Sequence, residues 1–114
     1  VEMLASRQFI FPPAAQSMGW RIGSKAFNMV LEADLPQKVG SILRDSVAGF
    51  LMEEGLSTTQ IAHWICHPGG RKILDAIQLQ LALNPSDLCH SRAVLQAVGN
   101  VSSVFIIFFA AFLA

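Results

Sequence analysis

Trp64-Ile65-Cys66-His67-Pro68-Gly69-Gly70 is the stretch that decides how this sequence folds. The apolar run Ile61–Cys66 predicts a buried strand, and the Pro-Gly-Gly that follows His67 ends it because these residues favour a turn. A histidine between a buried strand and a tight turn is held in place and still accessible to a ligand. On this segment alone, His67 is either an active-site residue or a turn histidine with satisfied hydrogen bonds.

Helical signals follow this segment. Apolar residues at helical spacing predict a helix that carries Ile73, Leu74, Ile77 and Leu81. A loop is expected at residues 84–87, and Ser91 is expected to cap a short helix that runs to Val98 and is broken by Gly99. Asn100 then opens a last helix. Its apolar run, residues 104–114, has about half of the ~20 residues that span a bilayer, so we expect a core helix and no membrane insertion.

Strand and helix signals also precede the segment. Residues 3–11 are mainly apolar and precede two prolines, which predicts a strand, and a turn is expected through Gly19 and Gly23. A second strand is expected at Phe27–Leu31. Asp34 and the nearby Pro36 are typical of a helix start, and an apolar stripe continues until Gly55. Alternating strands and helices predict one α/β layered domain over residues 1–114.

Composition narrows the function classes. Of the 114 residues, 53% are hydrophobic and 14% charged, which is enough apolar material for a core and excludes a disordered tail. Lys plus Arg and Asp plus Glu each number 8, so no basic stripe exists for nucleic acid. So few charges indicate a surface covered by a partner subunit or by a missing part of the same polypeptide, of which we favour the second.

The cysteine count and the N-terminus bear on location. Two cysteines are too few for the disulfide framework of a small secreted domain, and the sequence begins without a charged segment followed by an apolar core. We therefore expect a cytoplasmic, reducing environment.

A second motif, Gly99-Asn100-Val101-Ser102-Ser103, places an asparagine at a helix start beside small residues. Alone it is typical of an N-cap. The two motifs in this order, with Ser91-Arg92-Ala93-Val94-Leu95 between them, resemble the C-terminal domain of type III polyketide synthases, the chalcone and stilbene synthase family. Further segments are similar to that family, from about Glu2 to about Phe109: Met18-Gly19-Trp20, Asp34-Leu35-Pro36 and Ile73-Leu74-Asp75.

The resemblance implies a fold and a reaction. The fold would be the C-terminal half of a thiolase-like (αβαβα layered) fold, truncated at both ends. The reaction would be that of an acyltransferase, which condenses a starter acyl-CoA with malonyl-CoA through a Cys-His-Asn triad. His67 and Asn100 would be the catalytic residues of this half, and the resemblance also implies substrate-binding roles for Met29, Gly69, Gly70 and Ser102.

The resemblance also implies partners. CoA thioesters would be substrates, no cofactor or metal would be needed, and the full-length enzyme would be a homodimer with no nucleic acid or membrane partner. The nucleophilic cysteine would belong to an N-terminal half outside this sequence, so the chain alone should be inactive. Met29 stands where plant members usually have phenylalanine at the pocket entrance, and the sequence lacks the acidic residues and the Gly-Phe-Gly-Pro-Gly loop that usually follow the last helix.

Three other functions compete. A ketoacyl synthase of fatty acid synthesis is related, but such enzymes have His-Gln-Ala-Asn where this chain has His67-Pro68-Gly69-Gly70. A local Cys66-His67-Asn100 hydrolase is disfavoured because neighbouring strand residues point to opposite faces. A zinc module has the right ligand types but poor spacing; its ligands would be His63, Cys66, His67, Cys89 and His90.

Three cations bear on CoA binding. Arg71, Lys72 and Arg92 lie near the two motifs along the chain and could meet a CoA phosphate. The alternative, which we favour, is that they are solvated residues on helix faces.

Overall fold

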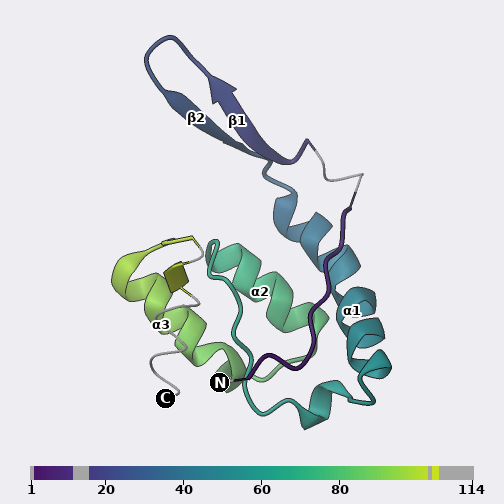
Figure 1. Cartoon of the computed structure of the whole chain (residues 1–114). Coiled ribbons are helices and arrows are strands. Elements are labelled where there is room, and N and C mark those ends of the chain that lie inside the picture. The colour runs from purple at the N-terminus through teal and green to yellow at the C-terminus, as the bar shows by residue number, and fades with distance from the viewer. Residues whose placement is uncertain (1, 12–15, 103, 106–114) are drawn as a thin grey trace.

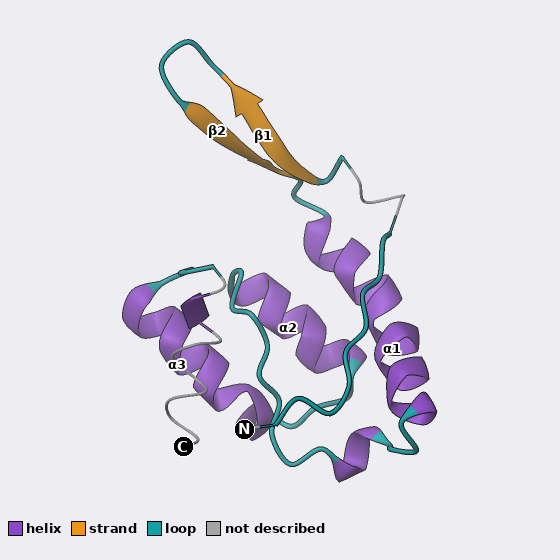
Figure 2. Cartoon of the chain, viewed as in Figure 1, coloured by secondary structure: helices purple, strands orange, loops and turns teal. Residues whose placement is uncertain are grey.

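The described residues of the chain form a β-hairpin and three α-helices (Figure 1). The structure is a computed structural model that describes residues 2–11, 16–102 and 104–105. The hairpin consists of β1 (Met18–Ile22) and β2 (Phe27–Leu31), and the helices are α1 (Leu35–Glu53), α2 (Arg71–Gln80) and α3 (Cys89–Val98). Two single 3-10 turns, Thr58–Gln60 and Pro85–Leu88, lie in the connections, and Figure 2 shows that the remaining links are loops.

The hairpin concentrates large apolar side chains on one of its faces. Side chains alternate along a strand, and the antiparallel register pairs each large apolar residue of β1 with one of β2. The pairs are Met18 with Leu31, Trp20 with Met29, and Ile22 with Phe27. All six side chains are between 55% and 76% exposed. The described residues therefore leave a whole sheet face of large apolar side chains uncovered.

A polar cluster attaches the base of the hairpin to α1. The carboxylate of Glu32 accepts hydrogen bonds from the Ser17 hydroxyl at 2.8 Å and from the Lys38 ammonium at 2.6 Å. Lys38 also pairs with Asp34 at 3.2 Å. The hydrogen bond from Lys38 holds the pKa of Glu32 below its ordinary value, and Glu32 in turn raises the pKa of Lys38.

The core lies between the helices. The sequence signals for α1 and α2 are confirmed, and α1 begins with Pro36 in its first turn. Gly40 lets the two helices approach closely, since a β-carbon there would lie 3.1 Å from Cγ of Gln80. Arg44 donates a hydrogen bond to the carbonyl of Gln80, at the end of α2 where cations are favourable. The buried core cluster is apolar and consists of Leu74, Ile77, Leu81 and Leu88.

Helix α3 begins at Cys89, so the prediction that Ser91 caps it was wrong. The 3-10 turn Pro85–Leu88 precedes the helix directly. Asp87 accepts a hydrogen bond from the backbone N–H of Asn84 at 2.7 Å, which closes that turn. Because the turn already starts the helical path, Ser91 lies inside α3 and is fully buried.

Two predicted strands are absent from the described residues. Residues 3–11 and 61–66 form no ladder, because no described strand lies beside them to pair with. The N-terminal segment runs instead alongside the helices, where Arg7 forms an ion pair with Glu53 (Figure 1). Gly19, expected in a turn, lies within β1, and the hairpin turn begins at Gly23, whose N–H donates to the carbonyl of Ala26.

The molecule is extended because the hairpin projects from the helices (Figure 1). Its radius of gyration is 15.4 Å, against about 13 Å for a compact domain of about 100 residues. The prediction that Asn100 opens the last helix was wrong, because residues 100–102 form a turn and not a helix. Phe105 is buried, and residues 106–114 of the predicted helix lie outside the described residues. Within the described part, no helix is both long and apolar enough to cross a bilayer.

Candidate functional site

The segment that carries His67 is irregular backbone held against the core. Trp64 and Cys66 pack against the cluster formed by α2 and the start of α3, and Pro68 is fully buried. His67, between them, is exposed. The segment is thus anchored on its apolar side while the imidazole stays open to solvent. The sequence predicted a fixed and accessible histidine, but at the end of a strand and not in an irregular segment.

A tight turn places the imidazole of His67 over Gly69. The backbone N–H of Gly69 donates to the carbonyl of His67 at 2.9 Å. A β-carbon on Gly69 would lie 3.6 Å from Cδ2 and 3.7 Å from Nε2 of His67, so the ring is in contact distance of this glycine. The carbonyl of the next residue, Gly70, accepts the first hydrogen bonds of α2, from Ile73 and Leu74.

Asn100 reaches the same glycine from the other motif. Its Nδ2 donates to the carbonyl of Gly69 at 3.2 Å, and its Oδ1 accepts from the backbone N–H of Ser102 at 3.0 Å. These two bonds fix which way the amide points. An amide nitrogen carries two hydrogens and Gly69 uses one, so the second is the donor that a ligand can use. His67 and Asn100 therefore meet at Gly69.

The backbone around Asn100 adopts conformations that side chains disfavour. Gly99, which ends α3 as predicted, has φ 75° and ψ −159°, a region open almost only to glycine. Ser102 has φ 55°, which costs free energy for any residue with a side chain. The turn Gly99–Ser102 redirects the chain after α3 so that the Asn100 amide points back to the His67 turn.

Met29 is not brought to this site. It lies on β2 with its side chain 55% exposed, on the hairpin that projects away from the helices (Figure 1). Of the six residues predicted for the site, five lie in the two motifs that meet, and the hairpin residue stands apart.

Cys66 does not have the character of a nucleophile. Burial raises the pKa of its thiol to about 11, whereas a catalytic cysteine needs a lowered value. The predicted strand that set Cys66 and His67 on opposite faces is absent, since residues 61–66 form no strand. The raised pKa of the part-buried Cys66 thiol disfavours a Cys66-His67-Asn100 hydrolase for a different reason.

The zinc module gains no support from the described residues. Among them, no three His, Cys, Asp or Glu side chains are grouped so that they could hold a metal ion.

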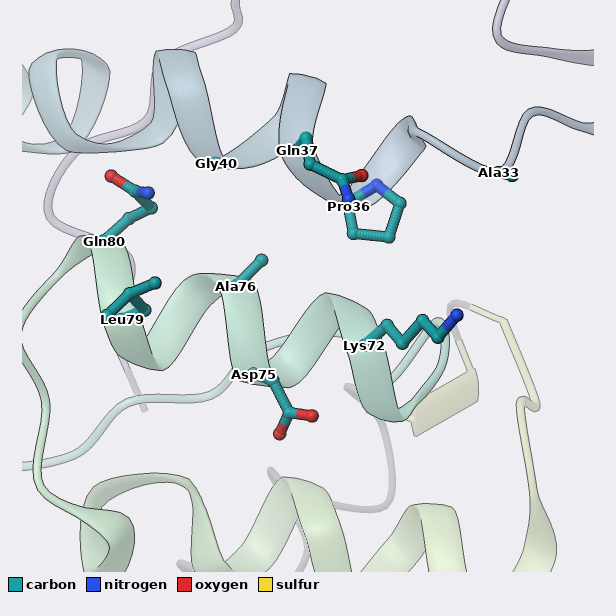
Figure 3. Close-up of a pocket in the computed structure, with 9 residues that line it drawn as sticks. All are labelled: Ala33, Pro36, Gln37, Gly40, Lys72, Asp75, Ala76, Leu79 and Gln80. Carbon is teal, nitrogen blue, oxygen red and sulfur yellow. The ribbon is translucent and has the colours of Figure 1, made fainter.

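The three cations near the site line two separate clefts. Arg92 pairs with Asp75 at 2.8 Å and donates to Gln78 at 2.9 Å, and with Arg71 it lines a cleft of about 510 Å³. Lys72 lies in a groove of about 280 Å³ between α1 and α2, together with Pro36 and other residues of both helices (Figure 3). The cations therefore do not converge on one anion site.

Sequence reasoning missed the place of Ser91. Its side chain is fully buried on the face of α3 that also carries Leu95, four residues after it, and Leu88, three residues before it, lies in the 3-10 turn that leads into the helix. This helical spacing was the available signal, because a small polar residue on a core-facing stripe needs a buried hydrogen-bond partner.

Known proteins resemble this chain over almost its whole length. The family model for the C-terminal domain of chalcone and stilbene synthases matches residues 2–113. The chain is 38% identical over 103 residues to 1,3,6,8-tetrahydroxynaphthalene synthase of Streptomyces peucetius subsp. caesius, which is 90% of this chain and 27% of that protein. It is 35% identical over 96 residues to 3,5-dihydroxyphenylacetyl-CoA synthase of Streptomyces toyocaensis, with 82% and 25% coverage.

One solved structure is similar to this chain in its fold. The crystal structure of PKS-I from the brown alga Ectocarpus siliculosus matches 84% of this chain and 26% of its own chain, with a TM-score of 0.73 and 24% identity, which supports the fold. The chain thus spans about a quarter of the length of these relatives. It belongs to the chalcone and stilbene synthase family, whose C-terminal domain it matches.

Proposed function

We propose that this chain is part of the C-terminal half of a type III polyketide synthase and supplies the histidine and asparagine of its Cys-His-Asn site. The family match motivates the proposal, and one observation carries it. The imidazole of His67 and the amide of Asn100 meet at Gly69, although they come from motifs far apart in the sequence. Two hydrogen-bond donors near one point are what a developing oxyanion requires.

The chemistry assigned to the two residues follows from charge. A cysteine thiolate, which a protonated imidazole stabilises, attacks the starter acyl-CoA, so that the acyl group becomes a thioester of the cysteine and CoA leaves as its thiolate. Loss of CO₂ from malonyl-CoA turns the thioester oxygen into an enolate oxygen, and the N–H groups of His67 and Asn100 donate to it. The enolate carbon then attacks the acyl thioester, and the cysteine thiolate leaves.

The remainder of the fold is also part of the proposal. We assign the nucleophilic cysteine and the other layers of an αβαβα arrangement to an N-terminal half that pairs with this chain. The uncovered apolar face of the hairpin, with Trp20 and Met29 at its centre, supports this because such a face needs a cover. The assembled enzyme would act as a homodimer on CoA thioesters.

A chimera tests the function. This chain replaces the matched segment of the Streptomyces peucetius synthase, and malonyl-CoA decarboxylation is measured as release of CO₂. We expect activity in the chimera, and a decrease of about a hundredfold or more in kcat for His67→Ala and for Asn100→Ala. His63→Ala is the matched control, since His63 is an exposed histidine on the same segment and outside the His67 turn.

The outcomes separate clearly. A chimera that unfolds cooperatively yet releases no CO₂ contradicts the proposed function. Equal activity in wild type, His67→Ala and Asn100→Ala contradicts the roles of these residues. A loss in His63→Ala as large as in His67→Ala would show that any disturbance of the segment has the same effect.

A further inference from the structure

Ser91 is a buried polar residue to which neither the family match nor the proposed chemistry assigns a role. It is 0% exposed, and its Oγ accepts a hydrogen bond from the backbone N–H of Cys66 at 3.3 Å. Cys66 immediately precedes His67. This bond is part-buried, and removing the partner of a backbone N–H that is partly shielded from water costs free energy, so the bond constrains the chain at the residue before the imidazole.

The anchors around His67 come from one helix and the residues just after it. Ser91 lies in the first turn of α3 and holds the N–H before His67. Asn100 follows the end of α3 and holds the carbonyl of Gly69, two residues after His67. His67 is thus bracketed by two hydrogen bonds, one from α3 and one from the turn that directly follows it. Between them the backbone has the internal turn of Gly69 and the buried ring of Pro68.

We infer that Ser91 is a positioning residue, whose hydroxyl fixes the backbone at Cys66 so that the imidazole of His67 stays over Gly69 beside the Asn100 amide. This inference rests on the proposed function for its effect on catalysis. The anchoring itself does not, because the irregular segment has no strand ladder among the described residues to hold it. Without the hydroxyl, the chain before His67 is held by apolar packing. Packing has no preferred direction, so it restrains the backbone position of Cys66 less than a hydrogen bond does.

The first measurement tests the anchor in the chimera, in which the rest of the synthase covers the apolar face of the hairpin. The rate of thiol alkylation at Cys66 is compared with that at the exposed Cys89 in the same sample by peptide mass spectrometry. Ser91→Ala should raise the ratio of the Cys66 rate to the Cys89 rate about tenfold. Ser91→Thr, which keeps the hydroxyl, should leave the ratio within about twofold. Ser86→Ala is the matched control, an exposed serine in the turn before α3.

A second readout separates local release from general destabilisation. Amide hydrogen exchange should accelerate in the peptide that contains residues 64–67 and stay unchanged in α2, which contains the core residues Leu74 and Ile77. Equal acceleration in both regions of Ser91→Ala would mean that Ser91 only supports overall stability, and this overturns the inference. An unchanged alkylation ratio in Ser91→Ala overturns it as well.

The third measurement tests the effect on catalysis in the chimera. Misplaced donors weaken stabilisation of the transition state more than binding of the substrate, so Ser91→Ala should lower kcat of decarboxylation about tenfold with KM within about twofold. Ser91→Thr should restore kcat. If Ser91→Ala keeps full kcat while His67→Ala loses it, the positioning role is wrong and the proposed function stands. If His67→Ala also keeps full kcat, the proposed function is wrong, and only the anchoring measured by alkylation is retained.

Discussion

Gly69 shows how a residue without a side chain organises this site. The imidazole of His67 is 3.6 Å from the place where a β-carbon would be, and the carbonyl of the same residue accepts from Asn100. The glycine therefore provides both a surface for the ring and an acceptor for the amide. Sequence reasoning identified His67, Asn100 and Gly69 as site residues, but it could not show the bond between Asn100 and Gly69. Hydrogen bonds between distant segments leave no local pattern.

The thiol of Cys66 gives a testable property at the same scale. Its ordinary pKa is 9.0 and burial raises the value to about 11, so at a given pH below 9 its thiolate fraction is about 100-fold smaller than that of an ordinary thiol. We expect alkylation at pH 8 to modify the exposed Cys89 well before the part-buried Cys66. Timed alkylation with peptide mass spectrometry measures both rates.

The same shift makes stability depend on pH, and its sign can be worked out. Between about pH 9 and about pH 11 the folded state keeps the Cys66 proton and the unfolded state has lost it. The free energy of unfolding should therefore fall as pH rises through this window. Urea denaturation at pH 8 and pH 10.5 in wild type and Cys66→Ser measures this. An equal decrease in both proteins would assign the pH dependence to other groups.

At the scale of elements, two glycines with the same open surroundings should respond oppositely to alanine. Nothing lies within 4 Å of a β-carbon built on Gly49 or on Gly99. Gly49 is inside α1, so Gly49→Ala should stabilise the chain by about 0.5 to 1 kcal/mol. Gly99 has φ 75°, so Gly99→Ala should destabilise it by about 1 to 3 kcal/mol. Urea denaturation measures both, and equal signs would contradict the described turn.

Elements differed in how well the sequence predicted them. Helix α1 was predicted from local signals, an Asp-Leu-Pro start and a glycine end, which act within a few residues. The predictions of strands at residues 3–11 and 61–66 were wrong because a strand needs a partner, and no described strand pairs with either segment. Strand β1 was missed because Gly19 suggested a turn, although Met18, Trp20 and Ile22 already alternate with a period of two.

At the scale of the whole molecule, the hairpin predicts self-association of the chain alone. Six large side chains on one of its faces are 55% to 76% exposed, and burial of a residue such as Phe27 stabilises by about 1.5 to 3 kcal/mol. We expect residues 1–114 to form oligomers or aggregates that bind a dye for apolar surfaces. Trp20→Lys with Met29→Glu, which charges the centre of this face, should shift light scattering toward a monomer.

A control on the other face of the hairpin sharpens this test. Arg21 and Asn28 are paired across the strands on the opposite face, so Arg21→Glu with Asn28→Lys introduces charges without touching the apolar face. This pair of substitutions should leave the scattering unchanged. A monodisperse wild-type monomer without dye binding would contradict both the exposed face and the proposal that another half covers it.

The bracket around His67 also limits how this sequence can vary in length. Ser91 and Asn100 act from opposite ends of α3, so the helix sets the spacing between them. One inserted residue in α3 would rotate everything after it by about 100° and move it about 1.5 Å along the axis. The loop before Trp64 does not fix a rotation or a distance between two residues of the site in this way. Insertions and deletions should therefore be tolerated around residues 54–60. Between Ser91 and Asn100 they should disrupt the site, because α3 fixes the distance and the rotation between these two residues.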